Sequence, residues 1–168
     1  MAQVEQLAEF VVRTSYDTLC GHVRDHLKIR VLDAVACAIG SLAGEPVRLI
    51  REQIEDFGGT RYCTLIGGGR TAPDRATLFN GALVRYLDFN DSYLAKGETC
   101  HPSDNLAPIL AAAEYAERNG RDLFSGTCRG LPGPVPVERC GAGPRQGLRS
   151  YDPGLLRGRS WSIARARS

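Results

Sequence analysis

Apolar residues recur at helical spacing along most of the first 120 positions. Val4, Leu7 and Val11 follow the i, i+3, i+7 pattern of one helix face, so the chain opens with an amphipathic helix. The same spacing continues on a second, longer helix, whose apolar face carries Leu27, Val31, Val35, Ala38 and Leu42. Small residues crowd this second helix, which lets a neighbouring helix approach closely.

Proline and glycine divide the rest of this region into further elements. Glu45–Pro46 begins a third helix with Val47, Ile50, Ile54 and Phe57 turned inward, and Gly58–Gly59 ends it. Pro73 opens a fourth helix that continues to Leu87. Ser103 is placed to cap a fifth helix, which Asn119–Gly120 ends.

Only one segment has the composition of a strand. Residues 61–66 contain β-favouring Tyr, Thr and Ile, and a run of three glycines follows as a turn, which predicts a short strand or an extended linker. No internal repeat is present. The sequence therefore predicts a mainly α fold, a helical bundle with at most one short strand.

Composition divides the chain into two parts after about Phe124. Residues 1–124 hold 13 Lys/Arg and 17 Asp/Glu, a net charge of −4, and we expect them to form the helical part. Residues 125–168 hold 8 Arg, no Lys and 2 acidic residues, a net charge of +6, together with 8 Gly and 5 Pro. Such a mixture buries little apolar surface, so we expect a disordered or poorly packed tail.

Two explanations compete for this tail. A basic, Gly-rich segment is typical of a nucleic-acid-binding arm. The same composition also arises when GC-rich codons are translated out of frame, and the change falls within a helix start, at residues 120–124. Because repeated RGG units and interleaved aromatics are lacking, we favour a frameshift or truncation and regard nucleic acid as an unfavoured partner.

Cysteine and histidine spacing predicts no metal site. None of the 6 cysteines forms a CxxC pair, and His22 and His26 lie four apart without the glutamate of the HExxH motif. The chain opens without the features of an export sequence, and no apolar run reaches the ~18 residues of a membrane span. We expect a reduced, cytoplasmic protein without a membrane partner.

Chemistry-bearing residues gather in the polar connection at residues 88–102. It holds Asp88, Asp91, Ser92 and His101 between two helical stretches, a placement that suits proton transfer. The two aspartates lie at a helix C-terminus, which is unfavourable unless a cation compensates. The alternative is that both are solvated and simply end the helix.

His101 has the features of a rigidly presented side chain. Pro102 restricts it to an extended conformation, and Ser103 begins a helix whose free N–H groups favour anions. His101 would then accept a proton beside a carboxylate-binding site, to which we assign Asp91, Ser103 and Lys96, the lysine nearest the cluster. A surface or satisfied histidine is the alternative that local sequence alone favours.

Two stretches resemble one enzyme family. NGALVRYLDFNDSY and CHPSDNLAPILAAAEYA, within residues 80–116, are similar to the MmgE/PrpD family of 2-methylcitrate dehydratases, cis-aconitate decarboxylases and relatives. Residues 16–42 resemble the N-terminal helices of that family, whose members are longer helical proteins with a second α+β domain. The spelling RYLDFND followed by HPSDN is closest to the 2-methylcitrate dehydratase branch.

The resemblance implies a reaction and roles for particular residues. It places Asp88, Ser92 and His101 on active-site positions, with His101 transferring the proton and Asp88 positioning it or the substrate. The reaction implied removes water from a tricarboxylate, 2-methylcitrate, in propionate catabolism, without a cofactor. Family members supply lysines and a further histidine from later sequence and often form homodimers, so we expect little activity from this chain alone.

Two other functions stay open at this stage. A cis-aconitate decarboxylase would share the same scaffold and release carbon dioxide. A non-catalytic helical module would use the basic tail, Arg129 to Arg167, to bind nucleic acid or a protein partner in a salt-sensitive way.

Overall fold

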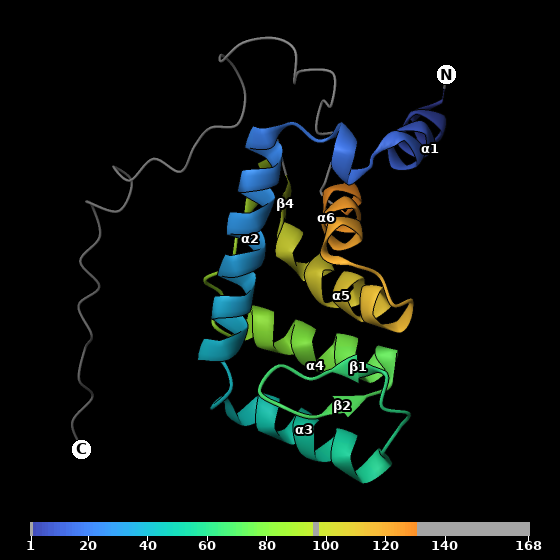
Figure 1. Cartoon of the computed structure of the whole chain (residues 1–168). Helices are drawn as coiled ribbons and strands as arrows, with labels where there is room; N and C mark the ends of the chain where they lie inside the picture. The colour runs from blue at the N-terminus through green and yellow to red at the C-terminus, as the bar shows by residue number, and fades with distance from the viewer. Residues whose placement is uncertain (1, 96–97, 131–168) are drawn as a thin grey trace, which may run out of the picture.

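The computed structural model describes residues 2–95 and 98–130, and the mainly α fold is confirmed. Helices account for most of the described residues (Figure 1). They are α1 (Gln3–Arg13), η1 (Tyr16–Thr18), α2 (Gly21–Gly40), α3 (Glu45–Phe57), α4 (Pro73–Tyr86), η2 (Pro102–Asn105), α5 (Leu106–Tyr115) and α6 (Gly120–Arg129), where η marks a 3-10 helix. Within this described part, no helix is both long enough and apolar enough to cross a membrane.

The β structure exceeds the single short strand expected from the sequence. β1 (Cys63–Thr64) pairs antiparallel with β2 (Arg70–Thr71), and β3 (Tyr93–Ala95) pairs antiparallel with β4 (Glu98–Cys100). The first pair forms because Gly67, Gly68 and Gly69 all adopt positive φ and reverse the chain. The second pair occupies part of the connection that was expected to be an irregular loop.

The core lies where α2, α4 and α5 pack together, with α3 against the outer side of α4 (Figure 1). Phe79 and Leu83 of α4 are fully buried, and so are Ala34 and Ala38 of α2. The two alanines confirm the expected close approach, because small side chains let α4 lie near the α2 backbone. Gly44 serves the same purpose at the next connection, since a Cβ there would lie 2.7 Å from the ring of Tyr86.

Some apolar positions that the pattern turned inward are exposed. On α3, Val47 and Ile54 are buried as expected, but Phe57 is 69% exposed. The valines and Leu7 of α1 are exposed as well, with Val12 at 81%, because most of this helix projects from the rest of the molecule (Figure 1). Phe10, near its end, packs against the cluster of Leu19, Leu27 and Cys128. The spacing of apolar residues therefore predicted the helices, but it did not predict which apolar faces pack against another element.

Helix α6 crosses the boundary that composition suggested at Phe124. It continues to Arg129, and its Cys128 is fully buried in a small cluster with Leu19 and Leu27. Burial raises the pKa of the Cys128 thiol, as expected for an apolar position. The helical part of the chain therefore includes residues 125–129. Residues 131–168, most of the expected tail, lie outside the described residues.

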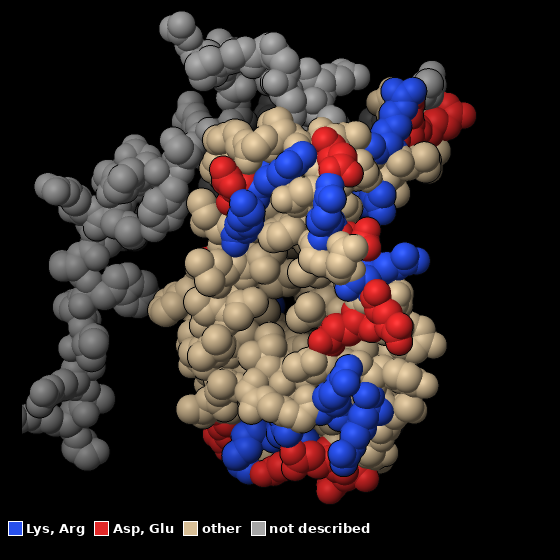
Figure 2. All heavy atoms as spheres, viewed as in Figure 1, with Lys and Arg blue, Asp and Glu red and all other residues tan. Residues whose placement is uncertain are grey.

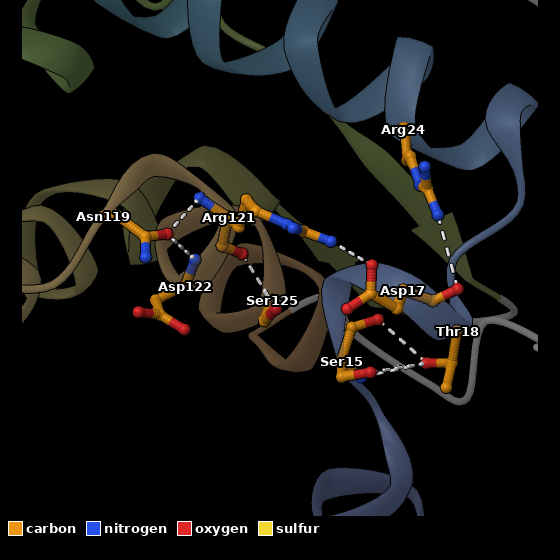
Figure 3. Close-up of polar contacts among 8 residues, drawn as sticks. All are labelled: Ser15, Asp17, Thr18, Arg24, Asn119, Arg121, Asp122 and Ser125. Atoms are coloured by element: carbon orange, nitrogen blue, oxygen red, sulfur yellow. Dashed lines mark hydrogen bonds and ion pairs between the residues drawn. The ribbon is translucent and has the colours of Figure 1, made fainter.

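Polar contacts anchor α6 to the N-terminal half (Figure 3). Asn119 caps the helix by accepting from the backbone N–H groups of Arg121 and Asp122. The Arg121 guanidinium then pairs with the carboxylate of Asp17, in η1, and also lies over the ring of Tyr16. These contacts join segments that are about one hundred residues apart in the sequence.

Candidate functional site

His101 is held by a hydrogen bond to the backbone. It stands between β4 and η2 with an extended backbone, which confirms the effect expected of Pro102. Its Nδ1 lies 2.8 Å from the carbonyl oxygen of Asp91. Because a carbonyl oxygen only accepts, Nδ1 carries the proton in this contact, and Nε2 of the neutral ring is left as a proton acceptor.

Ser92 lies beside the same ring nitrogen. Its hydroxyl oxygen is 3.5 Å from His101 Nδ1, at the outer limit of a hydrogen bond, and the residue is exposed. The structure thus brings Ser92 and His101 together as the sequence analysis expected. The hydroxyl is available to a ligand because its contact with the ring is weak.

Asp91 fixes the backbone that holds His101. Its side chain is only 14% exposed and pairs with the guanidinium of Arg30 on α2. The same carboxylate accepts a 3.0 Å hydrogen bond from the backbone N–H of Ser103. The sequence led us to expect a cation near this acid; α4 ends at Tyr86, before Asp91, and Arg30 compensates the mostly buried carboxylate directly.

Arg30 was missed by sequence reasoning, although it left a signal. It lies on the face of α2 that carries Leu27 and Ala34, three positions from the first and four from the second. A guanidinium on a half-buried helix face requires an opposite charge from another element. That requirement could have been inferred from the sequence, but the identity of Asp91 as partner depends on tertiary packing.

Asp88 is directed elsewhere. It adopts φ 54° immediately after the end of α4, is exposed, and forms an ion pair of 3.2 Å with Arg85. Among the contacts of the described residues, none joins Asp88 to His101. The resemblance assigned the positioning of His101 to Asp88 or gave it a substrate contact; in this structure Asp91 does the positioning.

Ser103 has a different partner from the one expected. It lies inside η2 rather than at the cap of α5, and its hydroxyl accepts a 2.6 Å hydrogen bond from the amide of Asn90. The amide oxygen of Asn90 in turn accepts from Arg85, at 3.1 Å. Asn90 and Ser103 are both buried, so they link the end of α4 to the start of α5.

These contacts form one connected group, which we name the His101 network. Its members are Arg30, Arg85, Asn90, Asp91, His101 and Ser103. Arg30, Asp91 and Ser103 also line a shallow recess between α2, η2 and α6. The arrangement holds the His101 ring in one orientation through Nδ1 and leaves Nε2 as the nitrogen that a substrate proton could reach. Lys96, the remaining predicted ligand, lies outside the described residues.

The histidine pair on α2 forms no larger cluster. The rings of His22 and His26 meet edge to face, with centroids 4.3 Å apart, and both residues are exposed. Within residues 2–95 and 98–130, no group of three or more His, Cys, Asp or Glu residues is arranged to hold a metal ion.

Comparison with known proteins identifies the family. The sequence model of the MmgE/PrpD N-terminal domain matches residues 5–131. The chain belongs to the MmgE/PrpD family. Similar MmgE/PrpD sequences include the 2-methylcitrate dehydratase of Cupriavidus necator, 31% identical over 114 residues, a match that covers 63% of this chain and 22% of that protein.

One further relative carries the same name, and another carries a different one. The 2-methylcitrate dehydratase of Escherichia coli K12 is 53% identical over 47 residues, which is 28% of this chain and 10% of that protein. A cis-aconitate decarboxylase-like protein of Aspergillus oryzae is 26% identical over 159 residues, 93% of this chain and 32% of that protein. This chain therefore spans a third or less of the length of these MmgE/PrpD relatives.

Proposed function

We propose that this MmgE/PrpD chain contributes to a hydro-lyase that removes water from 2-methylcitrate and forms 2-methyl-cis-aconitate. The observation that carries the proposal is the orientation of His101, whose Nδ1–H is bound by the Asp91 carbonyl at 2.8 Å. Several relatives named 2-methylcitrate dehydratase support the choice of substrate class, a small tricarboxylate. Homodimer formation through the helical domain belongs to the same proposal.

The chemistry assigns one step to His101. Dehydration removes a proton from the carbon next to a carboxylate, and the hydroxyl group of the neighbouring carbon leaves as water once an acid has protonated it. His101 Nε2 accepts the proton, while Arg30 and Asp91 keep the ring in position through the backbone. The Ser92 hydroxyl lies close enough to hydrogen-bond a substrate oxygen at the ring.

A shortage of unpaired positive charge near His101 should limit the turnover of this chain alone. The enolate-like intermediate requires cations in the site. The two described guanidinium groups of the His101 network already bind carboxylates, Arg30 with Asp91 and Arg85 with Asp88 and Asp104. We therefore expect substrate binding to be measurable but turnover to be slow.

The test compares two histidine variants of the chain. In NMR titrations with 2-methylcitrate, the His101 ring signals are expected to shift as the ligand binds. In an assay of 2-methyl-cis-aconitate formation, His101→Gln is expected to abolish the product. His22→Gln is the matched control, because His22 is an exposed histidine at the start of α2. A His101 ring that does not respond to 2-methylcitrate, or alkene formation that survives His101→Gln, would overturn the proposal.

A second candidate is decarboxylation of cis-aconitate. It is favoured by the similarity to the Aspergillus oryzae protein, which extends over 93% of this chain. Carbon dioxide release from cis-aconitate, measured on the same samples, separates the two reactions. Release that exceeds alkene formation from 2-methylcitrate would establish the decarboxylase instead.

A further inference from the structure

A second charged region lies away from His101, at the end of the molecule formed by α3 and the β1–β2 hairpin. Figure 1 shows this end below α4, whereas η2 and the start of α5 lie beside the upper part of α2. A cavity of about 430 Å³ opens here, a size typical of small-molecule sites. We name it the arginine cavity; it is lined by Arg51, Ile54, Glu55, Gly58, Gly59, Arg61, Leu65, Gly69, Arg70 and Thr71.

Positive charge exceeds negative charge around this cavity. Three guanidinium groups line it, from Arg51, Arg61 and Arg70, against a single carboxylate, from Glu55. Figure 2 shows basic side chains gathered at this end of the molecule, with acidic side chains nearby. Since Glu55 is bound by Arg51 at 2.6 Å, no carboxylate of the lining remains for Arg61 and Arg70.

Two of the lining arginines are held in place by backbone carbonyl groups. Arg51 Nη1 donates to the Gly68 carbonyl at 2.7 Å, and Arg70 Nη2 donates to the Tyr62 carbonyl at 2.6 Å. Each guanidinium has five N–H donors, so both keep donors for a ligand. Fixing them in advance lowers the entropy lost when an anion binds.

A fourth guanidinium, that of Arg75, lies beside Gly59, one of the residues that line the cavity. Arg75 Nη1 is buried and makes no hydrogen bond with the part of the chain that the structure describes. A Cβ at Gly59 would lie 3.0 Å from this atom and 3.3 Å from Thr71 Oγ1. Gly59 lies against this buried nitrogen without a side chain of its own, and its φ of 137° favours glycine there. A buried donor of this kind is commonly satisfied by an ordered water or an ion.

We propose that the arginine cavity binds a small anion that carries at least two carboxylate or phosphate groups. Guanidinium groups bind both kinds of oxyanion through paired N–H donors. The lining contains no histidine, and its one acid is already paired, so the cavity is suited to binding rather than to proton transfer. It is a site separate from His101 and does not depend on the proposed reaction.

The test is calorimetric titration of the whole chain at low ionic strength with citrate, with pyrophosphate and with inorganic phosphate. Saturable binding of citrate or pyrophosphate is expected, with inorganic phosphate weaker. The preferred probe distinguishes a polycarboxylate from a polyphosphate ligand. Affinity should fall as salt is added, since the contacts are charged. The absence of saturable binding for all three probes would overturn the proposal.

Matched variants assign the binding to the cavity. Arg61→Gln and Arg70→Gln are each expected to weaken binding by about tenfold, the effect of losing one charge-assisted hydrogen bond. Arg48→Gln is the control, because Arg48 lies on α3, pairs with Glu52 and is absent from the cavity lining. An equal loss in Arg48→Gln, or no loss in either cavity variant, contradicts the assignment.

Two further measurements separate binding in the cavity from other effects. A thermal melt of each variant shows that it is folded, and Arg61→Gln is the safer variant because Arg61 is exposed. The His101→Gln chain is expected to bind pyrophosphate with unchanged affinity. A loss there would place the anion at His101 instead and would overturn the separate site.

Discussion

The His101 network and the arginine cavity both concentrate charge, but they distribute it differently. In the network, Arg30 pairs with the carboxylate of Asp91, and buried amide and hydroxyl groups connect the members. Its other arginine, Arg85, pairs with two carboxylates outside the network, those of Asp88 and Asp104. In the cavity, three arginines face one carboxylate, and beside the lining residue Gly59 a buried nitrogen of Arg75 has no hydrogen-bond partner among the described residues.

Charged side chains thus have two different roles in this molecule, one in holding a geometry and one in binding an anion. Paired charges that are partly buried hold backbone and side chains in one geometry, so they favour a positioned histidine. Unbalanced charges of one sign repel each other and are stabilised when an anion binds. We therefore expect substitutions in the network to lower stability and substitutions in the cavity to change binding.

The largest effect is expected at Asp91. Asp91→Ala leaves Arg30 without its carboxylate and removes the acceptor for the Ser103 N–H, so the free energy of unfolding should fall by about 2–3 kcal/mol. Urea denaturation monitored by circular dichroism measures it. Asp25→Ala is the control, because Asp25 forms a largely exposed pair with Lys28 and should change stability by less than about 0.5 kcal/mol.

An Asp91→Ala chain as stable as Asp25→Ala would show that the Arg30–Asp91 pair contributes no more than a surface pair. The same urea series also tests the pair directly. Arg30→Met combined with Asp91→Ala should lose less than the sum of the two single changes, because the double variant leaves no buried charge alone. Additive losses would show that the two residues act independently.

A smaller effect is expected at Asp88, which belongs to the predicted site but lies outside the His101 network. Its φ of 54° suits Gly, Asn or Asp. Asp88→Asn should therefore change the free energy of unfolding by less than about 0.5 kcal/mol, whereas Asp88→Val should lower it by about 1–2 kcal/mol. Thermal melts of the two variants measure the difference.

The two Asp88 variants also separate the effect of the backbone conformation from the effect of the side-chain charge. If Asp88→Asn destabilises the chain as much as Asp88→Val, the ion pair with Arg85 matters more than the backbone conformation. If the two variants differ as expected, the main contribution of Asp88 to stability is its ability to adopt positive φ.

Local sequence predicted the helices but not all of their partners. The glycines after α3 and the prolines at the starts of α3 and α4 marked the helix boundaries because their effects are local. The boundary expected at Phe124 was displaced because Cys128 enters a cluster with Leu19 and Leu27, a contact over about one hundred residues. Composition cannot predict such a contact.

The candidate site shows the same division. The extended backbone of His101 follows from Pro102 and was predictable. The choice of Asp91 over Asp88 depends on the turn after α4, where Asp88 takes positive φ and points to Arg85. The arginine cavity could not be found from the sequence, because its three arginines come from separate elements: Arg51 from α3, Arg61 from the connection before β1, and Arg70 from β2.

The smallest effect on stability is expected in the cavity, and it has the opposite sign to that at Asp91. Arg61→Gln removes one of several like charges and breaks no hydrogen bond between described residues, so the free energy of unfolding should stay the same or rise by up to about 0.5 kcal/mol. Urea denaturation at low and high salt measures it. The gain should shrink as salt is added, because screening weakens the repulsion that the substitution relieves. A clear loss of stability would mean that Arg61 has a structural role, and the contrast between the two regions would then fail at this residue.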